Sequence, residues 1–154
     1  MRPLFAALLL TASFAHAATP PAARPGPPNI VFILADDLGW TDLGSYGSDL
    51  YQTPHLDRLA REGTRFTQAY SACTVCSPTR AAIMTGQYPA RTRVTDWIAG
   101  HAMPRARLSP PAWTQYLERS HYTVAEVLRD AGYATGHFGK WHLGMTEDLW
   151  AEHH

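Results

Sequence analysis

The pattern of apolar and polar positions along the chain predicts short strands that alternate with short helices. Residues 30–34 form a continuous apolar run rich in β-branched side chains, which is typical of a strand buried on both faces of a parallel sheet. Residues 64–70 alternate between apolar and polar side chains and predict a second strand, and residues 133–138 predict a third. We therefore expect an α/β fold with a mainly parallel sheet flanked by helices.

Three helices are predicted between and after these strands. Each is marked by a start signal or an apolar stripe and by a glycine at its end: Thr53-Pro54 with Gly63, residues 78–84 with Gly86, and the capping box Thr123–Glu126 with Gly132. Cys76 is expected at the N-terminal edge of the second helix. Residues 87–122 contain four prolines and no clear periodicity, and we interpret this segment as substrate-side loops.

The N-terminus has the features of a targeting segment. A basic start precedes an apolar run at residues 4–14, and Ala15-His16-Ala17 matches an A-x-A cleavage site. A buried N-terminal helix is the alternative interpretation. We expect a signal peptide at residues 1–17, a Pro/Ala-rich linker at residues 18–28 and a folded part at residues 29–154. The protein would then be exported to the periplasm or the extracellular space, without a membrane anchor because the run is too short to span a bilayer.

Composition narrows the classes of partner. Apolar residues make up 45% of the 154-residue chain, which suits a globular protein. Lys plus Arg and Asp plus Glu both number 13, so the formal net charge is zero. The chain therefore has no excess of basic residues that would indicate binding to nucleic acid or to an anionic lipid surface. The two cysteines, Cys73 and Cys76, lie too close in sequence to staple a fold and need a local explanation.

Two groups of polar residues follow the first and third predicted strands. Asp36 and Asp37 come directly after residues 30–34, and Lys140 and His142 come after residues 133–138. Sites in parallel α/β folds gather at the carboxyl ends of strands, so both groups are expected at one edge of the sheet. Adjacent carboxylates suit a hard cation such as Ca²⁺ or Mg²⁺, although a helix cap or a solvated turn would use the same residues.

Cys76 and Arg80 add a nucleophile candidate and a fixed positive charge. A thiol at a helix N-terminus lies in a positive local potential, and Arg80 is on the same helical face four residues later. Lys140 and His142 are two residues apart, so both would face one pocket if they continue a strand. Each of these residues alone could be an ordinary surface or structural residue.

The motifs and their order resemble those of a known enzyme family. Cys76-Ser77-Pro78-Thr79-Arg80 matches C-x-P-x-R, residues 81–86 continue it as AAIMTG, and residues 139–144 read GKWHLG. In these features the chain resembles the formylglycine-dependent, cysteine-type sulfatases of the alkaline phosphatase-like superfamily. The resemblance covers about residues 28–145, and it implies that residues 29–154 are the N-terminal part of a sulfatase catalytic domain.

The resemblance also implies a role for each motif residue. Cys76 would be oxidised to formylglycine by a formylglycine-generating enzyme, and its hydrate would attack the sulfur of a sulfate ester. Lys140 would bind the sulfate group, His142 would hydrogen-bond the formylglycine hydroxyl, and the guanidinium of Arg80 would suit nearby oxyanions. Asp36, Asp37 and the modified residue 76 would bind Ca²⁺, with Mg²⁺ possible.

Other functions remain open from the residues. Family members are several times longer and carry further ligands downstream, so the chain alone is expected to be inactive and marginally stable, and a non-catalytic secreted remnant is one alternative. Cys73-Thr74-Val75-Cys76 is a C-x-x-C motif, which favours an exported dithiol oxidoreductase as another. A phosphonate or phosphodiester hydrolase could use the same modified cysteine.

Overall fold

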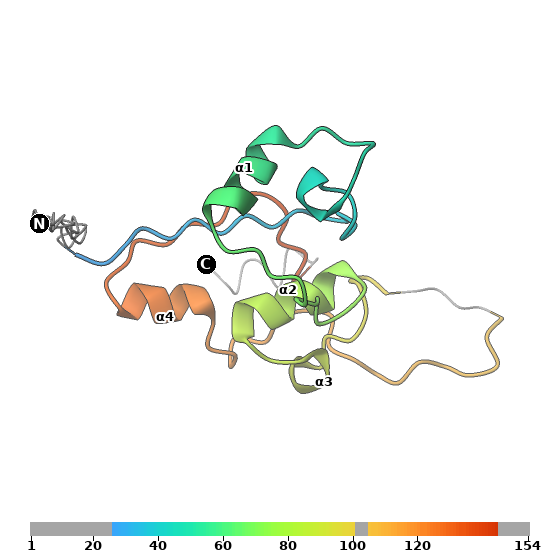
Figure 1. The fold of residues 1–154 in the computed structure, drawn as a ribbon. Helices are drawn as coiled ribbons and strands as arrows, with labels where there is room; N and C mark the ends of the chain where they lie inside the picture. The colour runs from blue at the N-terminus through green and yellow to red at the C-terminus, as the bar shows by residue number, and fades with distance from the viewer. Residues whose placement is uncertain (1–25, 101–104, 145–154) are drawn as a thin grey trace, which may run out of the picture. The chain divides into compact units, whose positions relative to one another are not determined.

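The computed structural model describes residues 26–100 and 105–144, and the chain divides into two compact units at Ala35 (Figure 1). The predicted signal peptide and most of the linker lie outside the described residues, as do residues 145–154 and His101. In the first unit, residues 27–35 have no helix or strand. The apolar side chains of residues 30–34 are between 41 and 83% exposed.

The second unit contains all the described helices. They are the 3-10 helix η1 (Gly44–Tyr46) and the α-helices α1 (Pro54–Glu62), α2 (Cys76–Thr85), α3 (Pro89–Thr92) and α4 (Val124–Asp130). None of them is long and apolar enough to cross a membrane, in the part of the chain that the structure describes.

Local signals in the sequence determine where these helices begin and end. Proline occupies the first turn of α1, and Gly86 ends α2 in the left-handed conformation with φ 66°. The predicted capping box of α4 is confirmed, since the Thr123 hydroxyl accepts from the Glu126 N–H and the Glu126 carboxylate accepts from the Thr123 N–H. Helix α2 begins at Cys76, two residues before the predicted start. Cys76 nevertheless lies at the N-terminal edge of the helix, as the sequence predicts.

The three predicted strands are absent from the described residues, and that prediction is wrong there. A strand exists only as a member of a hydrogen-bonded ladder, and residues 30–34, 64–70 and 133–138 pair with no neighbouring segment in the described parts of the chain. Their large side chains stay in solvent, with Phe66 70%, Tyr70 84% and Phe138 95% exposed. An apolar run indicates that a segment suits a sheet, but a strand forms only where a second segment lies beside it to share the hydrogen bonds.

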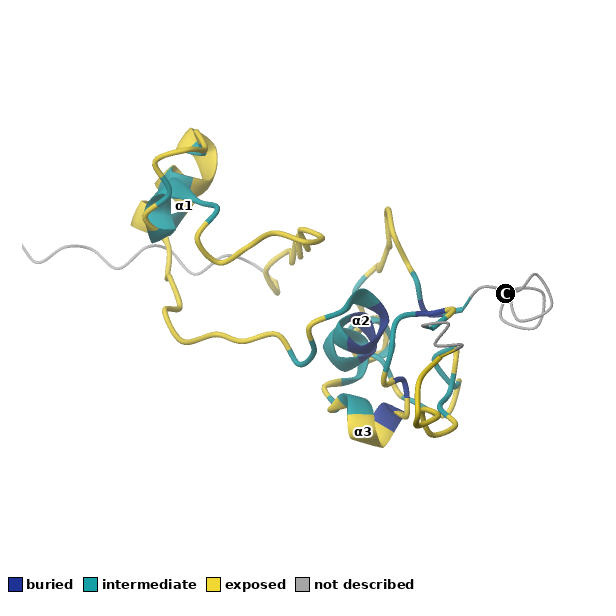
Figure 2. Ribbon diagram, turned by 90° about the vertical axis from the view of Figure 1, so that its right-hand side faces the viewer, coloured by how far each residue is buried: buried dark blue, intermediate teal, exposed yellow. Residues whose placement is uncertain are grey.

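The core of the second unit is small and lies around α2. Its buried apolar residues are Ala81, Val94, Ile98 and Leu143, with Met84, Trp113 and Leu117 packed against them. Figure 2 shows the buried colour concentrated on α2, the end of α3 and the adjoining loop. The segment 87–122, interpreted from sequence as substrate-side loops, therefore supplies one short helix and two of the four core residues.

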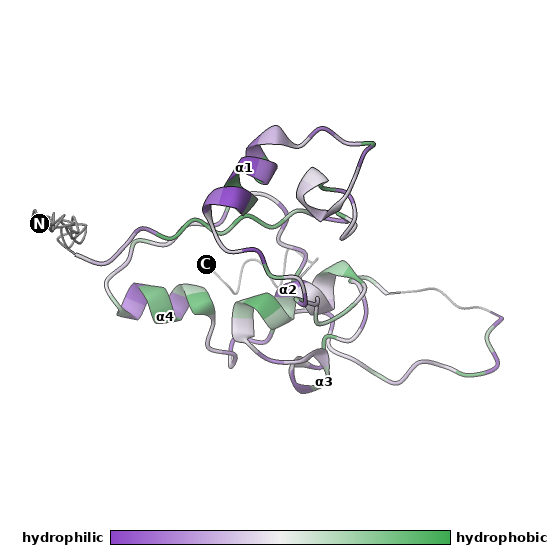
Figure 3. Ribbon diagram, in the orientation of Figure 1, coloured by the Kyte–Doolittle hydropathy of each residue, from purple (hydrophilic) through white to green (hydrophobic). Residues whose placement is uncertain are grey.

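Helices α1 and α4 bury no residue, in contrast to α2. Figure 3 shows apolar stretches on α2 and α4 and a mainly hydrophilic α1. Leu56 and Leu59, two apolar residues of α1, are 46 and 64% exposed. The two amphipathic helices α1 and α4 are thus present without a buried face, whereas α2 and the end of α3 contain buried residues.

Candidate active site

Helix α2 positions the first two candidate residues. Cys76 is its first residue and is half-buried, and Arg80 follows one turn later on the same face. The turn before Cys76 is fixed by hydroxyl groups that the sequence analysis did not single out. Thr79 donates to the carbonyl oxygens of Cys73 at 2.9 Å and Val75 at 2.8 Å. Ser71 donates to the Cys73 carbonyl at 2.7 Å, so the peptide groups leading into Cys76 are well anchored.

Asp36 brings together two cations that lie far apart in the sequence. Its Oδ1 accepts from Arg80 Nη2 at 3.0 Å, and its Oδ2 accepts from Lys140 Nζ at 2.6 Å. Arg80 also donates through Nη1 to the main-chain carbonyl of Lys140. The Arg80 side chain is only 10% exposed, whereas Asp36 and Lys140 are about two-fifths exposed at 41 and 42%. Three of the predicted site residues therefore form one ionic cluster.

The charged groups in this cluster shift each other's pKa values. The hydrogen bond from Lys140, and then that from Arg80, lowers the pKa of Asp36 below its ordinary value of 3.8. The hydrogen bond to Asp36 raises the pKa of Lys140 above 10.5. Asp36 is consequently an anion and Lys140 a cation throughout the neutral range.

Asp37 lies outside this cluster. It has the left-handed backbone conformation with φ 56°, which is uncommon for a residue other than glycine, and its side chain makes no ion pair within the described residues. Because it makes no such pair, Asp37 does not reinforce the ion pairs of Asp36 with Arg80 and Lys140. The left-handed backbone at Asp37 is the kind of strain that concentrates at functional sites.

The donor chemistry around Asp36 fits part of a hard-cation site. A carboxylate has about four acceptor positions, so Asp36 keeps free lone pairs beside Arg80 and Lys140. Asp37 adds a second carboxylate in sequence. However, no group of three or more His, Cys, Asp or Glu side chains comes together in the described residues. Ca²⁺ takes about six to eight oxygen ligands, so further ligands must complete any such site.

His142 makes contacts of its own, outside the cluster of Asp36, Arg80 and Lys140. Its Nε2 makes a hydrogen bond with the carbonyl oxygen of Ile98, and its ring centroid lies 6.5 Å from that of Trp97. The backbone at His142 is left-handed with φ 57° rather than extended. The expectation that Lys140 and His142 point the same way depended on a strand, and here the two side chains make separate contacts.

Two cysteines of the C-x-x-C motif are present as free thiols. Cys73 and Cys76 are both half-buried and are not joined by a disulfide. Cys73 is therefore only partly shielded from solvent. Its carbonyl oxygen, rather than its thiol, has the visible structural role, because it accepts the hydroxyls of Ser71 and Thr79.

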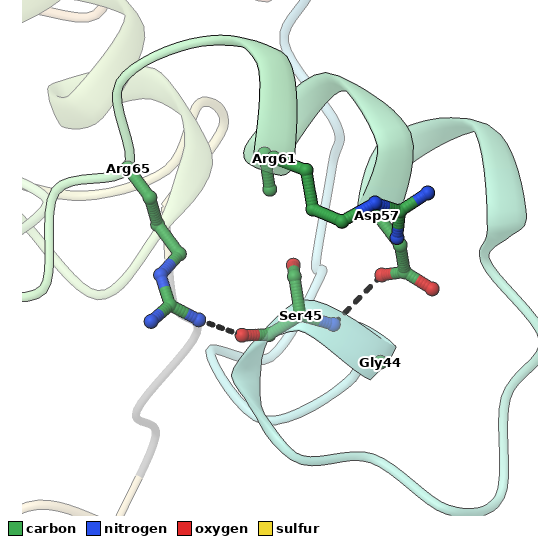
Figure 4. A pocket seen from close by; sticks show the side chains of 6 residues that line it. Gly44, Ser45, Asp57, Arg61 and Arg65 are labelled. Carbon is green, nitrogen blue, oxygen red and sulfur yellow. Dashed lines mark hydrogen bonds between the residues drawn. The ribbon is translucent and has the colours of Figure 1, made fainter.

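A surface pocket of about 440 Å³ lies between η1 and α1 and contains none of the candidate site residues (Figure 4). The Ser45 N–H donates to Asp57 Oδ1 at 2.7 Å, and Arg65 donates to the Ser45 carbonyl. Figure 4 shows Arg61 and Arg65 on either side of Ser45. This pocket is thus separate from the cluster around Asp36.

Comparison with known proteins identifies related sequences. The family model described as Sulfatase matches residues 28–148. The chain is 45% identical to mouse steryl-sulfatase over 149 residues, which is 94% of the chain and 23% of that protein. It is 44% identical to rat N-acetylgalactosamine-6-sulfatase over 80% of the chain, and 47% identical to human arylsulfatase A over 77% of the chain. These matches span 23 and 22% of the two relatives, so the chain spans under a quarter of the length of these curated relatives.

Proposed function

The chain belongs to the sulfatase family, and on that premise we propose that its residues form the nucleophile side of a sulfuric-ester hydrolase site. Membership of the family implies an α/β, alkaline phosphatase-like fold, and the described residues form only helices of it. The observation that carries the proposal is the convergence of Arg80 and Lys140 on Asp36, with Arg80 one turn from Cys76 on α2.

The proposed nucleophile is residue 76. Sulfatases generally use formylglycine and a divalent metal, and Cys76 lies in the motif that would be converted by a formylglycine-generating enzyme. A thiolate is a soft nucleophile, whereas the hydrated aldehyde supplies two hydroxyl groups on one carbon. One attacks sulfur and displaces the alcohol of the ester. Loss of the proton from the other then restores the aldehyde and breaks the C–O bond to sulfate, which is released. The half-buried position at the start of α2 leaves residue 76 accessible while the local potential favours an anion.

Arg80 and Lys140 are proposed to stabilise negative charge on the transferring group. Together with Asp36 they carry a net charge of +1, since two cations surround one carboxylate. That charge complements a singly charged sulfate ester, and oriented cations of this kind stabilise the transition state. A phosphodiester carries the same charge, so the choice between sulfate and phosphate substrates needs a direct assay.

Asp36, Asp37 and the modified residue 76 would hold the divalent metal, with Ca²⁺ favoured by the oxygen donors and Mg²⁺ as the second candidate. The metal would supply Lewis acidity towards the ester oxygens. His142 is proposed to accept a proton from a hydroxyl of residue 76 in the step that releases sulfate. Export of the protein, with residues 1–17 as its signal peptide, is part of the same proposal.

The proposal is tested with the natural full-length protein. We expect mass spectrometry of the peptide that contains residue 76 to show an aldehyde in place of the thiol, and we expect hydrolysis of p-nitrophenyl sulfate. Cys76→Ala should abolish both. Cys73→Ala is the matched control, because a sulfatase keeps its nucleophile in that variant, whereas a dithiol oxidoreductase loses half of its motif.

Three results would contradict the proposal. One is an unmodified Cys76 in active protein together with a loss of activity in Cys73→Ala, which would favour dithiol chemistry. Another is preferential hydrolysis of bis-p-nitrophenyl phosphate, which would assign the site to phosphodiesters. The third is absence of any turnover in fully converted protein, which would favour a non-catalytic role.

A further inference from the structure

The buried main chain of Ile98 connects the nucleophile helix to the candidate base. The N–H of Ile98 donates to the Oγ of Ser77 at 3.0 Å, and the carbonyl oxygen of Ile98 contacts Nε2 of His142. Ser77 and Ile98 are 0 and 1% exposed. Neither contact is local, since Ile98 is 21 residues from Ser77 and 44 from His142.

This contact determines which nitrogen of His142 carries hydrogen. A carbonyl oxygen can only accept a hydrogen bond, so Nε2 must be the donor. In a neutral imidazole the other nitrogen, Nδ1, then keeps its lone pair. Nδ1 is buried and has no hydrogen-bond partner among the described residues. The ring therefore has one nitrogen committed to the protein and one acceptor available.

Ser77 is the residue that anchors the main chain of Ile98 at its N–H. Its hydroxyl accepts the Ile98 N–H inside the core, where alanine or an aliphatic side chain would leave that N–H unsatisfied. On the other side, Leu143 follows His142, is 3% exposed, and accepts the Leu117 N–H at 3.0 Å through its carbonyl oxygen. The backbone on both sides of the His142 contact is therefore anchored.

We propose that Ser77 is a positioning residue that acts through the main chain of Ile98 to hold His142 as the Nε2–H tautomer, with Nδ1 as its proton-accepting atom. The inference rests on the proposed function, because Nδ1 is then the atom that receives the proton from the hydroxyl of residue 76. Successive helical residues point in different directions, so α2 directs Cys76 and Arg80 to the ionic cluster and Ser77 to the core. One helix thereby positions both the nucleophile and the base.

The test measures the tautomer directly, in the natural full-length protein. Long-range ¹H–¹⁵N correlation NMR distinguishes the two neutral tautomers and the imidazolium, and the signals of His142 are assigned by their loss in His142→Gln. We expect the Nε2–H tautomer in the unaltered protein at the pH of activity. Ser77→Ala should give a mixture of tautomers, and Ser77→Thr, which keeps the hydroxyl, should restore the single form.

Kinetics give the second readout. In Ser77→Ala, we expect kcat for p-nitrophenyl sulfate to fall about 10-fold with KM little changed, at the lower end of the range for general-base effects. The rate is normalised to the fraction of residue 76 that is converted. Ser120→Ala is the matched control, because that exposed hydroxyl contacts only Glu118 among the described residues, and it should leave tautomer and kcat unchanged.

The outcomes separate this inference from the proposed function. An Nδ1–H tautomer or an imidazolium in the unaltered protein would overturn the assignment, even if Ser77→Ala failed to fold. A single Nε2–H form with full kcat in folded Ser77→Ala would overturn the positioning role. The expected tautomer and its loss in Ser77→Ala, without any sulfatase turnover, would support the coupling of Ser77 to His142 while the proposed function alone failed.

Discussion

Helices α1 and α2 are predicted from similar sequence signals, but they differ in how far their residues are buried. Both were predicted from a short apolar pattern followed by glycine, and both form. Helix α2 buries Ser77, Pro78, Arg80 and Ala81, whereas α1 buries nothing in the described structure. The comparison shows that helix formation here is decided locally, whereas functional geometry arises only where a helix packs against distant segments.

The ion pairs of the two helices differ in the same way. In α1, Arg58 lies 3.8 Å from Glu62, with side chains 65 and 68% exposed. Such a surface pair contributes about 0.3–0.5 kcal/mol. In α2, Arg80 is 10% exposed and joins Asp36 and the Lys140 main chain across 44 and 60 residues. Burial and two separate partners make Arg80 part of a fixed site rather than a solvated surface charge.

The largest expected difference in catalytic activity is between substitutions of Arg80 and Arg58. Arg80→Lys keeps the charge but removes the planar fork that reaches Asp36 and the Lys140 carbonyl together. We expect kcat/KM of the natural full-length protein for p-nitrophenyl sulfate to fall by about 10²-fold. Arg58→Lys is the control and should keep full activity. Equal activity of both variants would remove the distinction between the buried and the exposed pair.

The next difference concerns the core. Ile98→Ala deletes a side chain that is 1% exposed and should lower the free energy of unfolding by about 2–5 kcal/mol. Leu59→Ala, on the exposed face of α1, should change it by less than about 0.5 kcal/mol in the 154-residue chain. Urea denaturation followed by circular dichroism measures both. A large loss in Leu59→Ala would show that the face of α1 is covered after all.

A smaller effect is expected on the titration of Asp36. Its pKa is lowered, so the ion pairs contribute stability above about pH 3.8, and this contribution is lost as the pH falls through the lower pKa of the folded state. The raised pKa of Lys140 means that its contribution is complete below pH 10.5 and is lost as the pH rises through the higher folded value. Pairing should therefore persist between these limits.

The measurement is a ¹³C NMR titration of the Asp36 carboxyl in chelator-treated protein. Lys140→Met removes the largest cause of the shift and should raise the pKa of Asp36 towards 3.8. Lys140→Arg retains a cation and should keep the pKa of Asp36 low. An unchanged titration in Lys140→Met would mean that Arg80 alone determines the protonation of Asp36.

The smallest effect is expected at the threonines that precede α4 and α1. Thr123→Ala removes the capping box of α4 and should lower the free energy of unfolding by about 1 kcal/mol. Thr123→Ser keeps the hydroxyl and should be nearly neutral. Thr53 does not cap α1 through its side chain. It instead accepts the Gly44 N–H at 2.9 Å and donates to Asp57, so Thr53→Ala should loosen η1 rather than shorten α1. Thermal unfolding and amide hydrogen exchange distinguish these results.

Much of the candidate site could be predicted because its residues belong to contiguous motifs. Cys76 and Arg80 are four residues apart on a helix, and a helix places such residues on one face without help from the rest of the fold. The roles of Ser77 and Ile98 could not be predicted in this way. A buried serine in a helix looks like any small polar residue until the peptide that it accepts from is known.

The sequence by itself determined the starts and ends of α1, α2 and α4 to within two residues, the capping box of α4, the position of Cys76 at the start of α2 and membership of the sulfatase family. These features depend on neighbouring residues and on motif order. The tertiary structure decided that Asp36 binds Arg80 and Lys140, that Ile98 contacts both Ser77 and His142, and that the predicted strands do not pair within the described residues. Those outcomes depend on contacts between residues tens of positions apart, which no local pattern specifies.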